Sequence, residues 1–195
     1  MDRVAPKSEA ETRAVYKPYD AVQGSNGFVP TSFHTLAHRP EILDGLSHLA
    51  GAVLGPGTVT RELKQLVAYV ASRSAGCLYC QSHTSHGAHN LGVSDAKIQG
   101  VWEFESDPQF DAAERSALRV ARDAALVPNA VTDDHFVALR EHFSDEQMVE
   151  IVSVISLFGF LNRWNDTMAT GLEEGALAFG AETLALDGWT AGKHA

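Results

Sequence analysis

A run of apolar residues between positions 145 and 172, DEQMVEIVSVISLFGFLNRWNDTMATGL, constrains the fold of this chain more than any other feature. Its apolar side chains fall on all sides of an α-helix instead of on one stripe, which is typical of a helix in the middle of a bundle. Ser144 precedes the run and can cap its first turn, which is acidic as the helix dipole prefers. The run therefore predicts a long central helix. Polar residues 162–166 interrupt it, which indicates a buried hydrogen-bond network or a subunit contact.

Other segments of the chain also repeat apolar residues at helical spacing. Helices are predicted from about Pro40 to Gly55, from Thr58 or Thr60 to Gly76, and from about Cys77 to Asn90. Three more helices are expected behind the capping residues Ser94, Asp111 and Thr132. A loop or short helical turns are expected over residues 25–34. No stretch alternates convincingly with period two, so the sequence predicts an all-α fold.

Length and composition set the domain organisation. The chain has 195 residues, of which 45% are hydrophobic and 21% charged, and this is enough to close a single core. We expect a flexible polar arm over residues 1–20 and one helical domain over residues 21–195. The sequence has no apolar run long enough to cross a bilayer and no secretion signal, so a cytoplasmic protein without a membrane partner is expected. Its net charge of -10, without a lysine or arginine cluster, argues against nucleic acid as a partner.

The segment GCLYCQSHTSHGAHN, residues 76–90, concentrates the groups that could carry chemistry. Two cysteines this close together cannot form the disulfide framework of a secreted protein. If Cys77 and Cys80 lie one turn apart at the start of a helix, both thiols face one side, near the positive end of the helix dipole. That position lowers a thiol pKa from about 8.5, and the spacing permits reversible disulfide formation. The pair is therefore interpreted as a redox-active dithiol.

Two alternatives compete with a redox pair. The first is a zinc site, because Cys77, Cys80 and His83 could share one helix face. His89 would point nearly opposite to Cys80, however, and no further cysteine is available, so we predict no metal and no other cofactor. The second alternative is a pair of buried, inert cysteines beside solvent-facing histidines.

The run RELKQLVAYVASRSAGCLYCQSHTSHGAHNLGVSDAKI resembles the core of the alkyl hydroperoxidase D-like proteins, a superfamily that includes the carboxymuconolactone decarboxylases. FHTLAHRPEIL near the N-terminus and NRWND near the C-terminus are similar to the longer, peroxidase-related branch. The resemblance covers roughly residues 28–170. It implies a compact helical fold that assembles into dimers, trimers or hexamers, with the cysteine pair in a cavity near a subunit contact.

The resemblance also implies roles for the two cysteines. Cys80 corresponds to the thiol that attacks a peroxide, and Cys77 corresponds to the resolving thiol. The family's proton relay adds a histidine four residues after the second cysteine, but this sequence has Thr84 there. His83, one helical turn from Cys80, is the expected replacement.

The relay carboxylate of the family also differs. The family has a glutamate twelve residues before the first cysteine, whereas this chain has Gln65, which can orient a water but cannot accept a proton. Glu62, one turn earlier on the same helix, is the other candidate for the relay.

Together these features predict a thiol-dependent oxidoreductase with an antioxidant role, which reduces small hydroperoxides through a dithiol/disulfide cycle. Its expected partners are a thiol or disulfide-reductase protein as electron donor and further copies of the same chain. The alternative keeps the fold without the thiol chemistry, either as a cofactor-free lyase with a histidine base or as a ligand-binding oligomer. The presence of both thiols favours the oxidoreductase.

Overall fold

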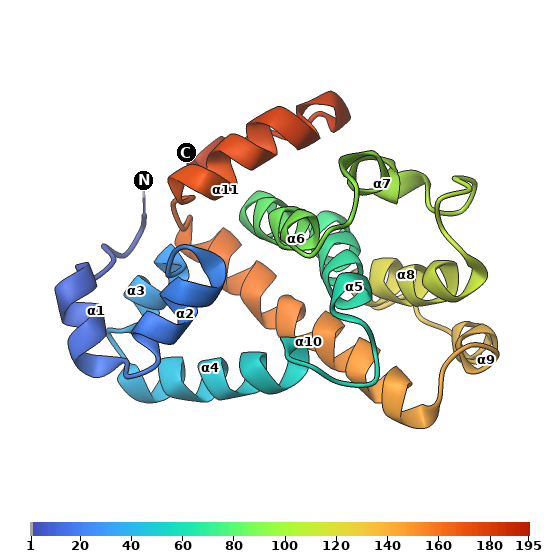
Figure 1. Cartoon of the computed structure of the whole chain (residues 1–195), viewed down its shortest axis with the longest axis horizontal. Coiled ribbons are helices and arrows are strands. Elements are labelled where there is room, and N and C mark those ends of the chain that lie inside the picture. The colour runs from blue at the N-terminus through green and yellow to red at the C-terminus, as the bar shows by residue number, and fades with distance from the viewer. Residues whose placement is uncertain (1) are drawn as a thin grey trace.

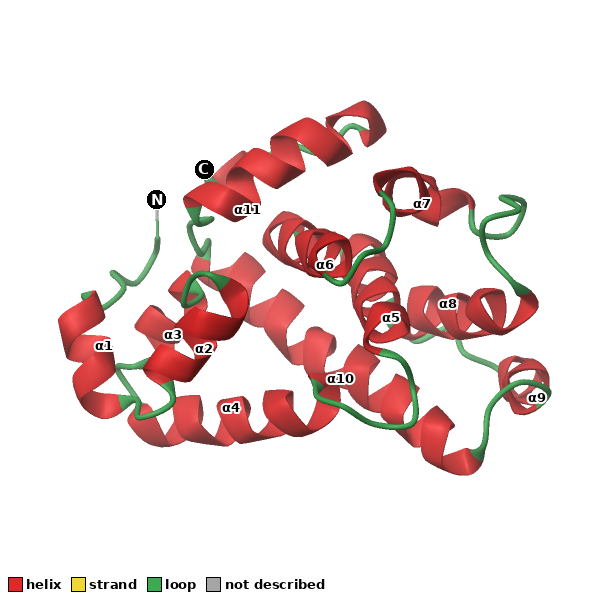
Figure 2. Ribbon diagram, viewed as in Figure 1, coloured by secondary structure: helices red, strands yellow, loops and turns green. Residues whose placement is uncertain are grey.

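The computed structural model describes residues 2–195, apart from the side chains of Ser25 and Asn26. Within these residues every regular element is a helix and no strand is present, which confirms the predicted all-α class (Figure 2). The α-helices are α1 (Glu9–Val15), α2 (Tyr19–Asn26), α3 (Thr31–Leu36), α4 (Pro40–Leu54), α5 (Arg61–Ser74), α6 (Leu78–Asn90), α7 (Asp95–Gln99), α8 (Ala112–Ala124), α9 (Asp133–Arg140), α10 (Asp145–Met168) and α11 (Glu174–Phe179). Single turns of 3-10 or π-helix follow α7 and α11.

The predicted capping residues begin their helices because each satisfies free N–H groups of its own first turn. Thr60 caps α5 and Ser94 caps α7 through side-chain hydrogen bonds. Capping boxes begin α8 at Asp111, α9 at Thr132 and α10 at Ser144. The predicted starts of these helices are confirmed.

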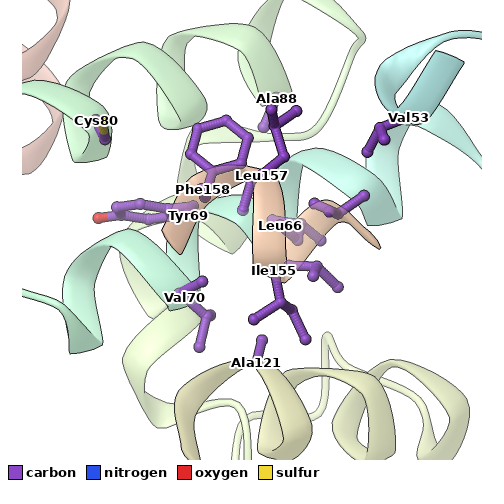
Figure 3. Packing of buried hydrophobic residues seen from close by; sticks show 14 of the residues in the cluster. Val53, Leu66, Tyr69, Val70, Cys80, Ala88, Ala121, Ile155, Leu157 and Phe158 are labelled. Atoms are coloured by element: carbon purple, nitrogen blue, oxygen red, sulfur yellow. The ribbon is translucent and has the colours of Figure 1, made fainter. Parts of the chain in front are cut away.

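Helix α10 runs through the middle of the molecule, as predicted (Figure 1). It packs against α4, α5, α6 and α8. Figure 3 shows Ile155, Leu157 and Phe158 of α10 within the buried apolar cluster, which also takes in residues of the helices around it. Helix α10 is not completely buried, however, because Val149 is 66% exposed and Phe160 is 44% exposed.

One ion pair ties the loop between α4 and α5 to α10. The Lys64 ammonium is almost fully buried, lies 2.7 Å from a Glu150 carboxylate oxygen and donates a hydrogen bond to the Gly55 carbonyl. Burial opposes ionisation of Glu150, but hydrogen bonds from Lys64 and from Thr58 lower its pKa to about 2. The pair therefore fixes the start of α5 against α10.

The expectation of a flexible arm over residues 1–20 does not match the structure. A capping box of Ser8 and Glu11 begins α1, and Thr12 hydrogen-bonds through Oγ1 to Nδ1 of His34 at 2.8 Å. Tyr16 and Tyr19 are buried. These contacts dock the segment on the body, so it belongs to the domain.

The chain after α10 folds back over the start of α6, where both cysteines lie. Ser82 donates a hydrogen bond to the Ala176 carbonyl, and the Trp189 indole N–H donates to the Leu78 carbonyl at 3.0 Å. Figure 1 shows α11 lying alongside α6. The C-terminal segment therefore covers the predicted site. Among residues 2–195, no helix is both long and apolar enough to cross a membrane.

Candidate active site at the start of helix α6

The two cysteines lie where the sequence predicted them. Cys77 is the N-cap residue of α6 and Cys80 lies in its first turn. Gly76, with φ of +75°, makes the turn from α5 into this helix. Both cysteines are free thiols, and their exposed fractions are 0% and 2%.

The two thiols differ in how easily each loses its proton. The pKa of Cys77 is lowered, chiefly by the hydrogen bond from the Cys80 thiol and further by the backbone N–H groups of Cys80 and Tyr79, against the opposing effect of burial. The pKa of Cys80 is raised well above its usual range by burial and by the neighbouring Cys77. The environment therefore favours a single thiolate on Cys77, with Cys80 as the protonated donor.

Helix α10 supplies the third polar group at the thiols. The Asn165 amide donates a hydrogen bond to the Cys80 sulfur over 3.4 Å. Asp166 is close enough for its negative charge to raise the pKa of both thiols. The predicted polar network over residues 162–166 thus includes a direct contact with the cysteine pair.

His83 does not hydrogen-bond to Cys80, its expected partner. One ring nitrogen, Nδ1, hydrogen-bonds to the Tyr79 carbonyl at 3.0 Å, and the other, Nε2, lies 2.7 Å from a Glu173 carboxylate oxygen. The ring also stacks on Tyr79, with 4.1 Å between centroids. Both nitrogens of His83 are therefore occupied by groups other than the thiols.

Glu173, the N-cap residue of α11, joins this histidine to two other elements. Its carboxylate accepts a hydrogen bond from the Tyr79 hydroxyl at 2.9 Å and another from the Thr31 backbone N–H. Burial opposes its charge, but the charge of His83 and the hydrogen bonds from His83 and Thr31 lower the pKa of Glu173 to about 2. Burial also opposes the charge of His83, yet Glu173 outweighs it and raises the His83 pKa. The two side chains therefore favour each other's charged forms, in a buried position near Cys77.

The other relay candidates lie away from the cysteines. Glu62 is exposed at the start of α5. Gln65 packs against α6 at Gly87, where an added Cβ would lie 2.9 Å from the Gln65 side-chain oxygen. Gly87 is seven residues after Cys80, or about 10 Å along a helix with a rise of ~1.5 Å per residue. In the described part of the chain, neither Glu62 nor Gln65 hydrogen-bonds to a thiol or to His83.

Thr84 fills the family's histidine position without offering a substitute base. Its hydroxyl donates a hydrogen bond back to the Cys80 carbonyl at 2.7 Å, inside its own helix. A threonine hydroxyl held in this way cannot take a proton from the thiol.

The three histidines of α6, His83, His86 and His89, do not point toward one common site. His86 stacks on Phe179 of α11, and His89 lies 2.7 Å from a carboxylate oxygen of Asp95. Over residues 2–195, no three His, Cys, Asp or Glu side chains come together as ligands for one metal ion.

A groove of about 700 Å³ opens between the end of α8 and α10. One wall is the end of α8 with the chain that follows it, and the other is the outward face of α10. Ala75, Asn162 and Asp166 line it. Ala75 comes two residues before Cys77, and Asn162 and Asp166 flank the asparagine that contacts Cys80. The inner end of the groove is therefore lined by neighbours of the residues at the thiol pair, while the two sulfurs themselves do not line it.

The model of the carboxymuconolactone decarboxylase family matches residues 40–123, from the start of α4 to the end of α8, including both cysteines. Over these residues the chain is similar to the carboxymuconolactone decarboxylase family. Its fold is that of the alkyl hydroperoxidase D-like superfamily, which confirms the resemblance seen in the sequence.

Solved structures of similar proteins extend the match beyond these helices. The debrominase Bmp8 is 29% identical, with a TM-score of 0.86 over 93% of this chain and 97% of that one. A cysteine-to-alanine variant of Bmp8, solved in complex with 2,3,4-tribromopyrrole, is 28% identical, with a TM-score of 0.87 over 94% of this chain and 98% of that one. An uncharacterized peroxidase-related protein from Ralstonia eutropha JMP134, described as an alkylhydroperoxidase AhpD core, is 25% identical, with a TM-score of 0.77 over 88% of this chain and 92% of that one. The uncharacterized protein YdfG of Bacillus subtilis is 25% identical over 109 residues, which are 55% of this chain and 72% of that protein.

Proposed function

We propose that the chain is a thiol-dependent oxidoreductase that reduces organic hydroperoxides with the Cys77–Cys80 dithiol. The observation that carries the proposal is the pair itself, two free thiols one turn apart at the start of α6, of which Cys77 has a lowered pKa. The family match over residues 40–123 and the fold shared with an alkylhydroperoxidase core support it. No cofactor is needed, since both electrons come from the two sulfurs.

The environment of the pair supports attack by Cys77, the reverse of the order that the family resemblance implies. In this proposal the Cys77 thiolate attacks the outer oxygen of the hydroperoxide and the O–O bond breaks. The leaving alkoxide takes the proton of Cys80 and departs as an alcohol, so Cys77 becomes a sulfenic acid and Cys80 a thiolate. Cys80 then attacks the Cys77 sulfur, the S–S bond forms, and hydroxide leaves. A disulfide-reductase protein or a small-molecule dithiol then reduces the disulfide.

Attack by Cys77 explains why this chain can lack the proton-relay residues of the family. Because Cys80 delivers the proton, neither a histidine at position 84 nor a glutamate at position 65 is required. His83 keeps a positive charge in the buried site and so stabilises the thiolate. We propose Glu173 as the positioning residue for His83, since its carboxylate holds the ring in place and keeps it charged.

A second candidate, reductive dehalogenation of an aromatic compound, is favoured by one specific observation. The structure of a debrominase matches nearly the whole chain, including the parts outside residues 40–123. The electrons balance equally well. The thiolate takes bromine as a sulfenyl bromide, the ring carbon takes a proton, and the second thiol displaces bromide to give the disulfide. Release of bromide from 2,3,4-tribromopyrrole, measured beside reduction of cumene hydroperoxide, distinguishes the two activities.

Single-cysteine variants test the proposed order of attack. With Cys80→Ser, one equivalent of cumene hydroperoxide should give a sulfenic acid on Cys77, which dimedone traps and mass spectrometry locates. Cys77→Ser should react at least tenfold more slowly at neutral pH, because the remaining thiol has the raised pKa. The double variant is the control. A dimedone adduct on Cys80 formed at the wild-type rate would restore the family's order, and reduction of the peroxide by the double variant would refute the thiol mechanism.

A further inference from the structure

The groove between the end of α8 and α10 has an apolar body and a polar inner end. Its outer part is lined by aliphatic and aromatic side chains that include Leu126, Val127, Phe136 and Ile155. Val127 is 83% exposed, so this part of the groove is open. Polar side chains gather toward the end of α10, the part of the helix from which Asn165 contacts Cys80. The size of about 700 Å³ falls within the roughly 300–1,000 Å³ of small-molecule sites.

Asn162 lines the inner end and is an unusual residue for that position. It is only 4% exposed, and within the described residues neither its amide nitrogen nor its amide oxygen has a hydrogen-bond partner. Buried amides are normally paired, because leaving both atoms unpaired costs free energy. A packed apolar face of another subunit would leave these atoms unpaired. A ligand with a donor and an acceptor side by side would satisfy both.

We propose that this groove binds the substrate, and that the substrate is a largely apolar aryl compound whose reactive end carries a hydrogen-bonding group for Asn162. The substrate class rests on the proposed function, whereas binding of an aryl ligand in the groove does not. The apolar walls take the ring, and the polar end directs the electrophilic group toward Asn165 and the two sulfurs. Hydrogen peroxide has no apolar part, so contacts with the apolar walls of the groove do not strengthen its binding.

Gly159 offers a direct way to fill the groove. It lies on the α10 wall, and a Cβ built on it meets nothing within 4 Å. Gly159→Leu therefore adds bulk to the groove without a clash in the core, and leucine is a better helix former than glycine. Gly51→Leu is the matched control, since Gly51 is also exposed on a helix, α4, with nothing within 4 Å of an added Cβ. Ser156→Phe, on the same wall, is the second groove variant, and circular dichroism checks that all three are folded.

The first measurement is binding of N-phenyl-1-naphthylamine, a neutral fluorescent diaryl amine, which does not depend on turnover. Wild type and Gly51→Leu should bind it equally, and Gly159→Leu and Ser156→Phe at least tenfold more weakly. No binding to the wild type, or equal binding to all four proteins, overturns the proposal. A groove variant that changes the sedimentation mass also overturns it, because the groove is then an interface between copies of the chain.

The second measurement compares peroxides. Gly159→Leu should lower kcat/KM for cumene hydroperoxide at least tenfold and leave that for hydrogen peroxide within twofold of the wild type. Unchanged reduction of cumene hydroperoxide, together with weakened dye binding, overturns the assignment of the groove to the substrate. If the wild type reduces neither peroxide, the proposed function fails on its own, while the dye measurement still decides whether the groove binds aryl ligands.

Discussion

Replacing Glu173 by glutamine should cost about 3 kcal/mol of folding free energy near pH 6, and less at both lower and higher pH. The carboxylate lies 2.7 Å from the His83 ring, and the two side chains are only 13% and 17% exposed. Glutamine keeps the shape but removes the charge, so the buried imidazolium loses its counter-ion.

The magnitude follows from the pKa of Glu173, which falls from 4.5 to about 2 in the folded chain. Each pKa unit corresponds to about 1.36 kcal/mol, so the folded state gains about 3 kcal/mol from the ionised carboxylate. A lowered pKa stabilises the fold above pH 4.5, and this contribution is lost as the pH falls toward 2. The pKa of His83 is raised above 6.5, so the same interaction weakens again as the pH rises through that raised value. The two shifts describe one ion pair and are not added.

Urea denaturation at pH 3, 6 and 9 measures the effect. The difference between wild type and Glu173→Gln should be largest at pH 6 and fall to less than half at pH 3, since that pH lies inside the titration window of the carboxylate. Glu174→Gln, at the exposed next position, is the control and should change little at any pH. In the Glu173 variant the His83 pKa, followed by NMR, should fall below 6.5, because burial then dominates. An equal loss at pH 3 and pH 6 would refute the ion-pair reasoning.

Two further expectations concern stability and assembly. Lys64→Met should lower the free energy of unfolding in urea by about 3 kcal/mol, because Glu150 keeps its charge without its buried partner. Lys193→Met, which removes an exposed ion pair, should cost less than about 1 kcal/mol. We also propose that the chain forms a homo-oligomer, supported by the exposed Leu49 and Val149, so sedimentation should show a species heavier than the 21.0 kDa chain. A monomer at every concentration would contradict the proposal.

The helices were predictable where their signals are local. A capping residue acts on N–H groups two or three positions later, so Ser94 and Asp111 specify the starts of α7 and α8 without help from the rest of the chain. The docking of the N-terminal segment was not predictable, because it depends on distant contacts. The hydroxyl of Tyr16 hydrogen-bonds to Ser47, 31 residues later, and a polar sequence gives no sign of that partner.

The residues of the site also differ in whether a local sequence signal predicts them. The cysteine pair is a local motif, and its position at the start of α6 agrees with the helix predicted to begin around Cys77. Asn165 belongs to a polar run inside an apolar helix, which was a usable signal for a buried network. Glu173 gave no such signal, because a Glu-Glu pair after a long helix looks like a solvated turn. Its partners Tyr79 and Thr31 lie 94 and 142 residues earlier in the chain, so only the fold brings them together.

The pairing of His83 with Glu173 changes what that histidine can do. A histidine one turn from a thiol suggests a general base, and a base needs a free ring nitrogen. In His83, Nδ1 is hydrogen-bonded to a carbonyl and Nε2 faces a carboxylate. In the proposed mechanism the ring therefore acts through its charge. A fixed charge shifts the pKa of a nearby thiol without exchanging a proton with it, so the protonation step falls to the dithiol itself. The pH at which the dithiol becomes reactive then depends on Glu173 as well as on His83, because removing the carboxylate discharges the imidazolium.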